Sequence, residues 1–535
     1  MRILAAILLL PASLAFAAPP EVTSLLPTGI TRGQTAEVSA GGNLGGIWPL
    51  QVWTDNPGLS VEALADRGKL KVTAAADARL GLTWVRLMGA DGASSPRPLF
   101  VGSLPEVAEV EPNNNIKERQ QLSGPAIVTG KLQKQNDVDF FSIPAQAGQT
   151  IVASVIGHEL LGSPMDAVLQ ICTENGTVVA QNNDSHGLDP QVTYVATQGG
   201  NYLIRNFAFP SEPNSTIAFA GGDNYLYRLT ITTGGFADHT LPLAVQRGKP
   251  ADLKFFGWNL ASPGAMFEVP AADIRDNLFF QPQDAAGLVP LAVVNHPSLV
   301  AEISASRETP QECPIPCTIS GTLDEPKDVD VFRFTAVKGR ALTIKAESDS
   351  IGYEVDPVLR VTDEAGKILA EAESAQRGAE PVLNFTPAAD GTYRLEIVDL
   401  HRRGGLRFAY RLMLAPITPD FSVSLAAGTF TIAPGKTLEI PLTIDRKNGF
   451  AAEIDITAEN LPAGITAAPL KSLPTGDSAK TAKLILTATA EVKPGMFQIV
   501  AKAVGEPPLS RRATFPTKIG PGTYNHGEVW LGIGK

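Results

Sequence analysis

The sequence is poor in cysteine, in charge and in aromatic residues. It has 3 cysteines in 535 residues, and charged and aromatic residues make up 19% and 7%. Three cysteines are too few for a disulfide scaffold, so core size must stabilise each module. The formal net charge of -11 offers no basic surface, which argues against nucleic-acid partners. Beyond the first 17 residues, no stretch approaches ~20 uninterrupted apolar residues, so no transmembrane segment is predicted.

Local signatures of catalysis are also missing. The chain has no Gly-x-Ser-x-Gly elbow, no Gly-x-x-x-x-Gly-Lys-Ser/Thr loop and no His-Glu-x-x-His helix. His158-Glu159 begins like the zinc motif, but the second histidine is absent, and the other histidines are isolated. We predict no enzyme activity and no catalytic residues. A triad assembled from distant residues stays open, because spacing alone does not exclude it.

The N-terminus has the pattern of a signal peptide. Arg2 precedes an apolar run, and the small-residue site Ala15-Phe16-Ala17 follows. Residues 1–17 are therefore predicted to be removed, with no lipoprotein anchor because no cysteine lies at the cleavage site. We expect an exported protein, located in the periplasm, at the cell surface or outside the cell.

The rest of the chain has the periodicity of β-sandwiches. Short apolar or alternating runs, bounded by Gly, Pro, Asn and Asp, recur every 8 to 12 residues, as at 150–156 and 225–232. The fold class predicted is all-β, with tandem β-sandwich modules.

An internal repeat organises these modules. Asp137-Val-Asp139-Phe-Phe matches Asp328-Val-Asp330-Val-Phe, and flanking positions match at an offset of 190 or 191 residues, including Gly130 with Gly321. A fainter repeat precedes each copy. The predicted segments are a signal peptide at 1–17, sandwiches at 19–103, 105–234, 238–302, 308–416 and 419–520, and a C-terminal tail at 521–535.

The motifs of the repeat resemble a known family. The string Glu109-Val-Glu111-Pro-Asn113-Asn114, with Gly130, Asp137-Val-Asp139 and Gly200-Asn-Tyr202, resembles the bacterial pre-peptidase C-terminal domain. That family is a jelly-roll-like β-sandwich related to the collagen-binding domains of bacterial collagenases. The resemblance covers about 105–233 and 308–415. The modules before each copy resemble immunoglobulin-like domains of the IPT/TIG class, and the last module resembles the NEW3-like immunoglobulin type.

Oxygen-bearing side chains gather at one end of the first repeat unit. Alternate positions of an extended segment share a face, and hard oxygen ligands suit calcium. In the collagen-binding relatives, the residues that match Glu109, Glu111, Asn113 and Asn114 coordinate calcium. The candidate metal ligands are Glu109, Glu111, Asn113, Asn114, Asp137 and Asp139. The equally weighted alternative is a solvated acidic linker in which Asp137 caps the next strand.

The second repeat unit departs from this pattern. Its corresponding string is Glu308-Thr-Pro-Gln-Glu312, so that Asp328 and Asp330 alone remain of the set and calcium is not expected there. A local disulfide between Cys313 and Cys317 is the hypothesis for what holds this segment instead.

These observations favour a non-catalytic, exported, multidomain binding or structural protein. Its expected partner is an extracellular protein or polysaccharide, and calcium is its one expected cofactor. Two alternatives remain, namely an accessory protein of a secreted peptidase or other hydrolase acting in trans, and a hydrolase with a dispersed site.

Overall fold

The chain folds into a series of small two-sheet β-structures, which confirms the all-β prediction. The computed structural model describes residues 18–213, 215, 217–271, 273, 275–376, 379–505 and 509–534. The expected signal peptide at 1–17 lies outside the described residues. No helix of the described residues has the length and apolar character needed to cross a membrane.

Alternating side chains explain why these segments form half-buried strands. In β38 (Thr437–Lys447), Ile440, Leu442 and Ile444 are buried, while the residues between them are exposed. The neighbouring strand β42 (Thr481–Ala488) alternates in the same way. Successive strand residues point to opposite faces, so each such strand gives one face to a core and the other to solvent.

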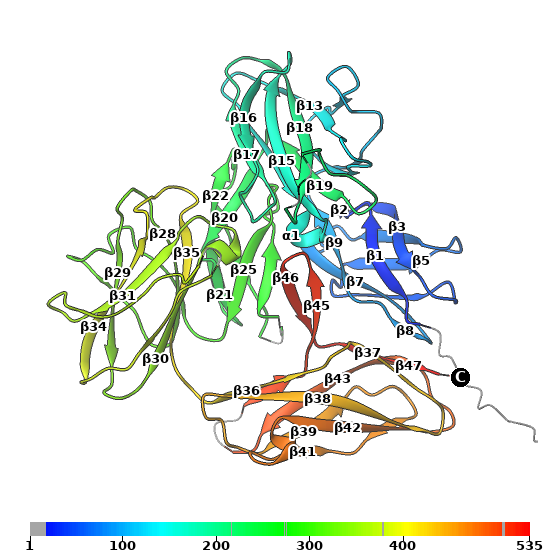
Figure 1. Ribbon diagram of the computed structural model, residues 1–535, viewed down its shortest axis with the longest axis vertical. Coiled ribbons are helices and arrows are strands. Elements are labelled where there is room, and N and C mark those ends of the chain that lie inside the picture. The colour runs from blue at the N-terminus through cyan, green and yellow to red at the C-terminus, as the bar shows by residue number, and fades with distance from the viewer. Residues whose placement is uncertain are drawn as a thin grey trace, which may run out of the picture.

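The strands group into five modules along the chain (Figure 1). Module 1 contains β1 (Glu21–Leu26), β2 (Gly29–Thr31), β3 (Thr35–Asn43), β4 (Gln51–Thr54), β5 (Leu59–Ala63), β6 (Lys69–Ala74), β7 (Gly81–Gly89), β8 (Gly92–Ala93) and β9 (Arg97–Gly102). Module 3 contains β20 (Phe236–Leu241), β21 (Ala244–Gln246), β22 (Pro250–Trp258), β23 (Gly264–Glu268), β24 (Asn277–Phe280) and β25 (Val289–Val294).

Modules 2 and 4 are larger sandwiches. Module 2 contains β10 (Glu106–Ala108), β11 (Gln120–Gln121), β12 (Ala126–Lys131), β13 (Asp139–Ala145), β14 (Thr150–Ile156), α1 (His158–Leu161), β15 (Met165–Thr173), β16 (Val178–Asn182), β17 (Gln191–Val195), β18 (Gly200–Pro210) and β19 (Leu226–Thr232). Module 4 contains β26 (Ser298–Val300), β27 (Gln311–Glu312), β28 (Cys317–Thr322), β29 (Asp330–Ala336), β30 (Leu342–Glu347), η1 (Asp349–Ile351), β31 (Pro357–Thr362), β32 (Ile368–Ala372), β33 (Val382–Phe385), β34 (Gly391–Asp399) and β35 (Ala409–Pro416).

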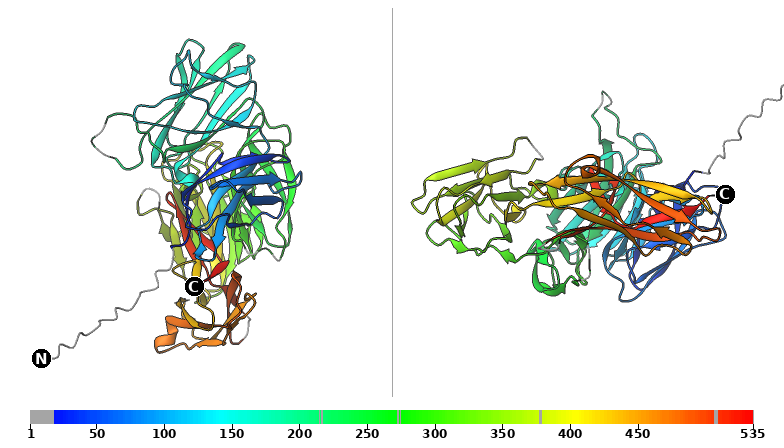
Figure 2. Two further views of the ribbon diagram at one scale, coloured as in Figure 1. Left: turned by 90° about the vertical axis from the view of Figure 1, so that its right-hand side faces the viewer. Right: turned by 90° about the horizontal axis from the view of Figure 1, so that it is seen from below.

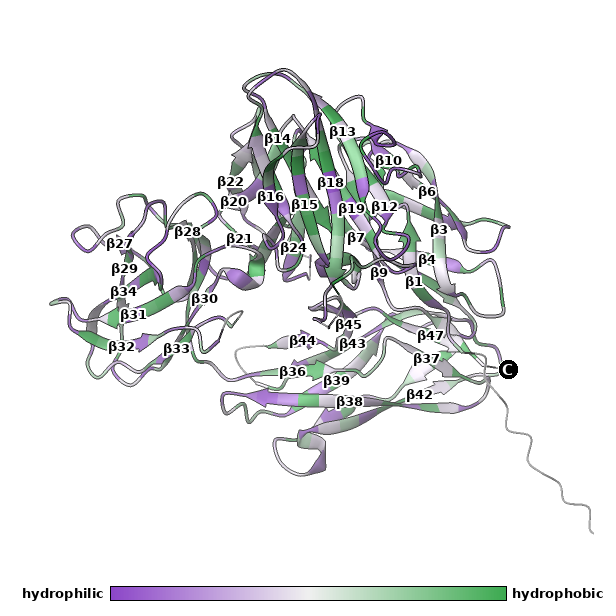
Figure 3. Cartoon of the chain, turned by 45° about the horizontal axis from the view of Figure 1, so that its top comes forward, coloured by the Kyte–Doolittle hydropathy of each residue, from purple (hydrophilic) through white to green (hydrophobic). Residues whose placement is uncertain are grey.

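The two large sandwiches have the same strand order. Module 2 pairs the sheets β10-β12-β19-β14-β17 and β11-β13-β18-β15-β16, and module 4 pairs β26-β28-β35-β30-β33 and β27-β29-β34-β31-β32. In each, the first strand runs parallel to its neighbour and the remaining pairs are antiparallel. Hydrophobic residues concentrate along the strands of module 2 (Figure 3).

Module 5 extends to the end of the described chain. It contains β36 (Asp420–Ser424), β37 (Thr429–Ile432), β38, β39 (Ile454–Glu459), β40 (Ile465–Ala467), β41 (Leu470–Ser472), η2 (Asp477–Ala479), β42, β43 (Gly495–Ala503), β44 (Ser510–Arg512), β45 (Phe515–Ile519), β46 (Gly522–His526) and β47 (Val529–Ile533). β47 lies between β37 and β43 in one sheet. The segment predicted as a tail at 521–535 is therefore part of module 5 over its described residues, 521–534, because β47 supplies buried core residues.

The modules contact one another through buried polar groups. Module 2 lies at the top of Figure 1 and module 5 at the bottom, and Figure 2 shows them at opposite ends of the long axis. Arg86 of β7 donates to the carbonyl oxygens of Glu528 at 2.9 Å and Gly428 at 3.1 Å, which joins module 1 to module 5. Arg228 of β19 pairs with Glu106 at 2.7 Å beside Phe100 of module 1.

Candidate functional site

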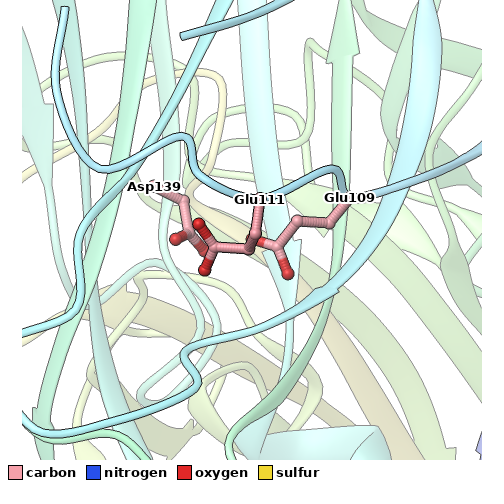
Figure 4. Close-up of side chains that lie close together, drawn as sticks. All are labelled: Glu109, Glu111 and Asp139. Atoms are coloured by element: carbon pink, nitrogen blue, oxygen red, sulfur yellow. The ribbon is translucent and has the colours of Figure 1, made fainter. Parts of the chain in front are cut away.

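Three acidic side chains meet at one end of module 2 (Figure 4). The chain leaves β10 in extended form, where the Glu109 N–H donates to the Thr129 carbonyl oxygen at 3.0 Å, so Glu109 continues along the edge of β12. Asp139 opens β13 in the facing sheet. One carboxylate oxygen from each of Glu109, Glu111 and Asp139 lies within 4.8 Å of the others.

A tyrosine of β19, in the sheet that faces Asp139, lies against two of these carboxylates. The Tyr227 hydroxyl is 2.7 Å from Glu109 Oε1 and 2.6 Å from Asp139 Oδ2. Its single proton can serve one of them at a time. A Cβ on Gly130 would lie 2.3 Å from the Tyr227 hydroxyl, so the glycine of the repeat makes room for this contact.

The cluster is electrostatically unfavourable without a cation. Burial, followed by the charge of Glu109, raises the pKa of Asp139 to about 10. Burial also raises the pKa of Glu111, to which the charges of Asp137 and Glu109 add. Like charges that share a buried site disfavour ionisation, and a bound cation reverses that preference.

The amide side chains and Asp137 surround the three carboxylates. Asn113 is buried, its Nδ2 donates to Glu109 Oε1 at 3.1 Å, and its backbone N–H donates to Glu111 Oε2 at 2.9 Å. Asn114 Nδ2 donates to Glu111 Oε2 at 3.2 Å. Asp137 lies outside the group of three, and one of its oxygens accepts from the Gln133 N–H.

Three buried oxygen atoms of the predicted set have no hydrogen-bond partner. They are Asn113 Oδ1, Asp137 Oδ1 and Asp139 Oδ1, on side chains with 0% exposure. Leaving such an atom unsatisfied costs about 1–3 kcal/mol. Free oxygens beside a carboxylate cluster are the donor set that a hard cation uses, and calcium accepts six to eight of them with flexible geometry. The residues therefore fit a calcium ion.

Two further residues lie at this cluster and were not predicted from the sequence. Tyr227 comes from β19, and Asn206 of β18 is directly paired with Asp139 in the strand register. The amide nitrogen and the amide oxygen of the Asn206 side chain are both buried without a hydrogen-bond partner. Cross-strand partners lie on the same face, so Asn206 adds polar atoms to the cluster next to Asp139. Register between distant strands is not readable from the sequence.

Module 4 lacks the corresponding oxygen-bearing side chains. The positions equivalent to Glu109, Glu111 and Asn113 are not the ones predicted from the sequence. The Ala301 N–H bonds to the Ser320 carbonyl as Glu109 does to Thr129, and the Val331 N–H bonds to the Ala305 carbonyl as Phe140 does to Asn113. Hence Ala301, Ile303 and Ala305 stand where module 2 has Glu109, Glu111 and Asn113. The match to Glu308–Glu312 was wrong, because the entry strand β26 pairs with β28 before that segment.

The residues around the cluster also differ in module 4. Asp330 accepts from the Tyr410 hydroxyl, as Asp139 does from Tyr227, but Ile397 pairs with Asp330 where Asn206 pairs with Asp139. Asp328 accepts from the Asp324 N–H, repeating the contact of Asp137 with Gln133. Asp137 thus has a turn-forming role that both modules share.

A cavity of about 2200 Å3 is lined by residues of all five modules. Its walls include Trp53, Trp84, Phe279 and Tyr524, together with the Arg79–Asp55 ion pair at 3.0 Å. The two lining imidazoles belong to His186 and His526, and burial lowers the pKa of each to about 4. Within the described residues, neither ring has a hydrogen bond to a hydroxyl or thiol.

The match to a curated protein covers only a part of the chain. No protein-family model matches the chain. A stretch of 101 residues is 31% identical to a probable subtilase-type serine protease of Deinococcus radiodurans, covering 18% of this chain and 13% of that protease. The chain therefore spans about an eighth of that relative's length.

Two solved structures show low overall similarity. The pre-peptidase C-terminal domain of a Bacillus anthracis collagenase is 18% identical, with 19% of this chain and 92% of that domain covered and a TM-score of 0.17. A Bacteroides ovatus mixed-linkage glucan utilization protein, SGBP-B, solved with a heptasaccharide, is 11% identical, with 74% of each chain covered and a TM-score of 0.14.

Proposed function

We propose that the chain is an exported, non-catalytic binding protein that recognises extracellular protein or polysaccharide and whose module 2 is stabilised by calcium. The observation that carries the proposal is the cluster of carboxylates beside three buried oxygens without partners. Glu109, Glu111, Asn113 and Asp139 would hold the ion, Asp137 would add its free oxygen, and Asn114 would remain at the rim. Bound calcium supplies positive charge that lets these carboxylates stay ionised.

The ion would fix a segment that connects two modules. Glu106, three residues before Glu109, pairs with Arg228 against module 1. The segment from Glu106 to Asn114 therefore contacts module 1 at its start and the oxygen cluster at its end. Calcium at the cluster would hold that segment against β13 and β19, and so preserve the surface formed by modules 1 and 2.

The central cavity supports a binding role. Its wall combines aromatic rings with paired charges, which is the composition of many ligand sites. A hydrolase of the serine or cysteine type with its site in this cavity would need a lining imidazole within reach of a nucleophile. The contacts of His186 and His526 do not provide that arrangement in the described chain.

An accessory role beside a secreted peptidase or other hydrolase is the second candidate. The similarity of a 101-residue stretch to part of a subtilase-type protease favours it. In that case the partner would be the hydrolase itself or its substrate. Co-purification with a secreted hydrolase, in place of a matrix polymer, would favour this candidate.

Thermal unfolding of the full chain in calcium and in chelator tests the metal. A ligand at ~100 times its dissociation constant stabilises the folded state by roughly 2.7 kcal/mol. We expect wild type to gain several degrees with calcium and Glu109→Gln/Glu111→Gln to gain none. Glu308→Gln/Glu312→Gln removes two carboxylates of module 4 that lie outside the cluster; it is the control and should respond as wild type does.

Binding to a panel of insoluble polysaccharides and fibrillar collagen tests the partner class. We expect retention on at least one polymer, with less retention in chelator. A calcium response without retention on any polymer would keep the metal site and reject this partner class. Hydrolysis of a panel substrate by the purified chain would contradict the non-catalytic assignment.

A further inference from the structure

Two cysteines occupy core positions of module 4 that are aliphatic in module 2. The Cys313 N–H donates to the Arg333 carbonyl oxygen at 2.9 Å, as the Leu122 N–H donates to that of Ser142 at 2.8 Å. Cys317 opens β28 as Ala126 opens β12. The pair Cys313 and Cys317 therefore replaces the pair Leu122 and Ala126.

The two positions belong to different sheets. Cys313 follows β27, which pairs with β29, whereas β28 pairs with β26 and β35. A covalent bond between the two sulfur atoms would join the edge strand β27 of one sheet to β28, the second strand of the other sheet. It would do so next to the segment where module 4 lacks the oxygen cluster of module 2.

The two side chains lie in the same buried core cluster of module 4. They are thiols in the structure, 7% and 0% exposed. The third cysteine, Cys172, is in the core of module 2. In the described chain, the one group of three or more metal-ligating side chains is the carboxylate cluster, so the thiol pair lacks the partners for zinc.

We propose that Cys313 and Cys317 form a disulfide that joins the two sheets of module 4. Each thiol loses one hydrogen and a sulfur–sulfur bond forms. The two electrons and two protons pass to a protein or small-molecule disulfide, which is reduced to two thiols. This cross-link does not depend on calcium binding by module 2.

The local environment explains when the bond would form and what it would do. The hydrogen bond to Cys317, together with burial, raises the pKa of Cys313, so the thiol reacts poorly once the module has closed. Oxidation therefore belongs to folding, while the segment is accessible. In the folded module the bond would act beside the paired contacts of Arg307 with Glu396, at 2.9 and 2.8 Å, to hold the entry segment.

Peptide mapping of the full chain tests the bond. Protein exported by the expression host and equilibrated with oxidised glutathione is unfolded and alkylated with iodoacetamide before reduction. We expect the tryptic peptide 308–327 to be lighter by two hydrogen atoms and unlabelled, and to take two labels after reduction. Cys172 is the internal control and should be labelled in every sample. Two labels on 308–327 before reduction would overturn the proposal.

A double substitution tests the structural role. Cys313→Leu/Cys317→Ala copies the pair of module 2 and leaves the packing filled. In calorimetry of the full chain, reductant should lower one unfolding transition of wild type by several degrees and leave the variant unchanged. An equal effect of reductant on both proteins would contradict a stabilising cross-link. If the variant does not fold, the mapping result still decides whether the bond exists.

Discussion

Modules 2 and 4 have the same strand order, but they use it for different chemistry. In module 2, Glu109, Glu111 and Asn113 bring oxygen atoms to Asp139 and Tyr227. In module 4, alanine and isoleucine replace those three residues, and the Asp330–Tyr410 pair remains. The difference shows that the sandwich itself does not need the cluster, because module 4 forms the same sheets without it.

The largest expected difference concerns pH. Burial raises the pKa of Asp330 from 3.8 to about 7. Above pH 4 the unfolded chain has lost this proton while the folded chain keeps it, so the unfolded state binds fewer protons. The free energy of unfolding of module 4 should therefore fall by about 4 kcal/mol as the pH rises from 4 through 7.

Asp330→Asn should remove that pH dependence. The amide keeps the shape and still accepts from Tyr410, so the variant should match wild type near pH 4 and exceed it above pH 7. Denaturant unfolding at several pH values measures the difference. Parallel pH curves for wild type and variant would show that Asp330 ionises normally in the folded chain.

Exchanging the entry residues should abolish the calcium response. Glu109→Ala/Glu111→Ile/Asn113→Ala gives module 2 the residues of module 4. We expect the stabilisation by calcium, about 2.7 kcal/mol at a hundredfold excess over the dissociation constant, to disappear. Stability in chelator should not fall, because the buried like charges are removed as well. A retained calcium shift would mean that the ion binds elsewhere.

The paired glycines separate packing from metal binding. A Cβ added to Gly130 would lie 2.3 Å from the Tyr227 hydroxyl oxygen, and a Cβ added to Gly321 would lie 2.4 Å from the Tyr410 hydroxyl oxygen. Each Gly→Ala change should cost about 1–3 kcal/mol through overpacking. Only Gly130→Ala should also weaken calcium binding in a titration. Equal calcium affinity in both variants would separate Tyr227 from the metal site.

The smallest expected effect concerns Asn206. Asn206→Ile copies Ile397 of module 4 and removes a buried amide whose atoms have no partners. If the amide orients Asp139 or a bound water, affinity for calcium should fall about 10-fold, as is usual for groups behind the ligands. Calcium titration measures it, and unchanged affinity would assign Asn206 to packing alone.

The sequence was sufficient for the sandwich class and for most of the oxygen cluster. Alternation and turn residues predict strands, and the spacing of Glu109, Glu111 and Asn113 places them on one face. The repeat also marks Gly130, although the reason for the glycine appears only when Tyr227 is seen against it.

Other features depend on pairings between distant strands. Tyr227 and Asn206 join the site through β19 and β18, whose register with β13 is set by the folded sandwich. In module 4 the entry strand has lost its acidic residues, so the sequence offered Glu308–Glu312 as a false match. The segment of β47 was predicted as a tail because its two partners, β37 and β43, lie well before it in the chain and the pairing is not visible in the sequence.

Calorimetric titration of the full chain with calcium tests the central claim most directly. The account predicts one calcium ion per chain for wild type and none for Glu109→Ala/Glu111→Ile/Asn113→Ala. No binding by wild type would contradict the metal site, and two ions per chain would contradict the difference between modules 2 and 4.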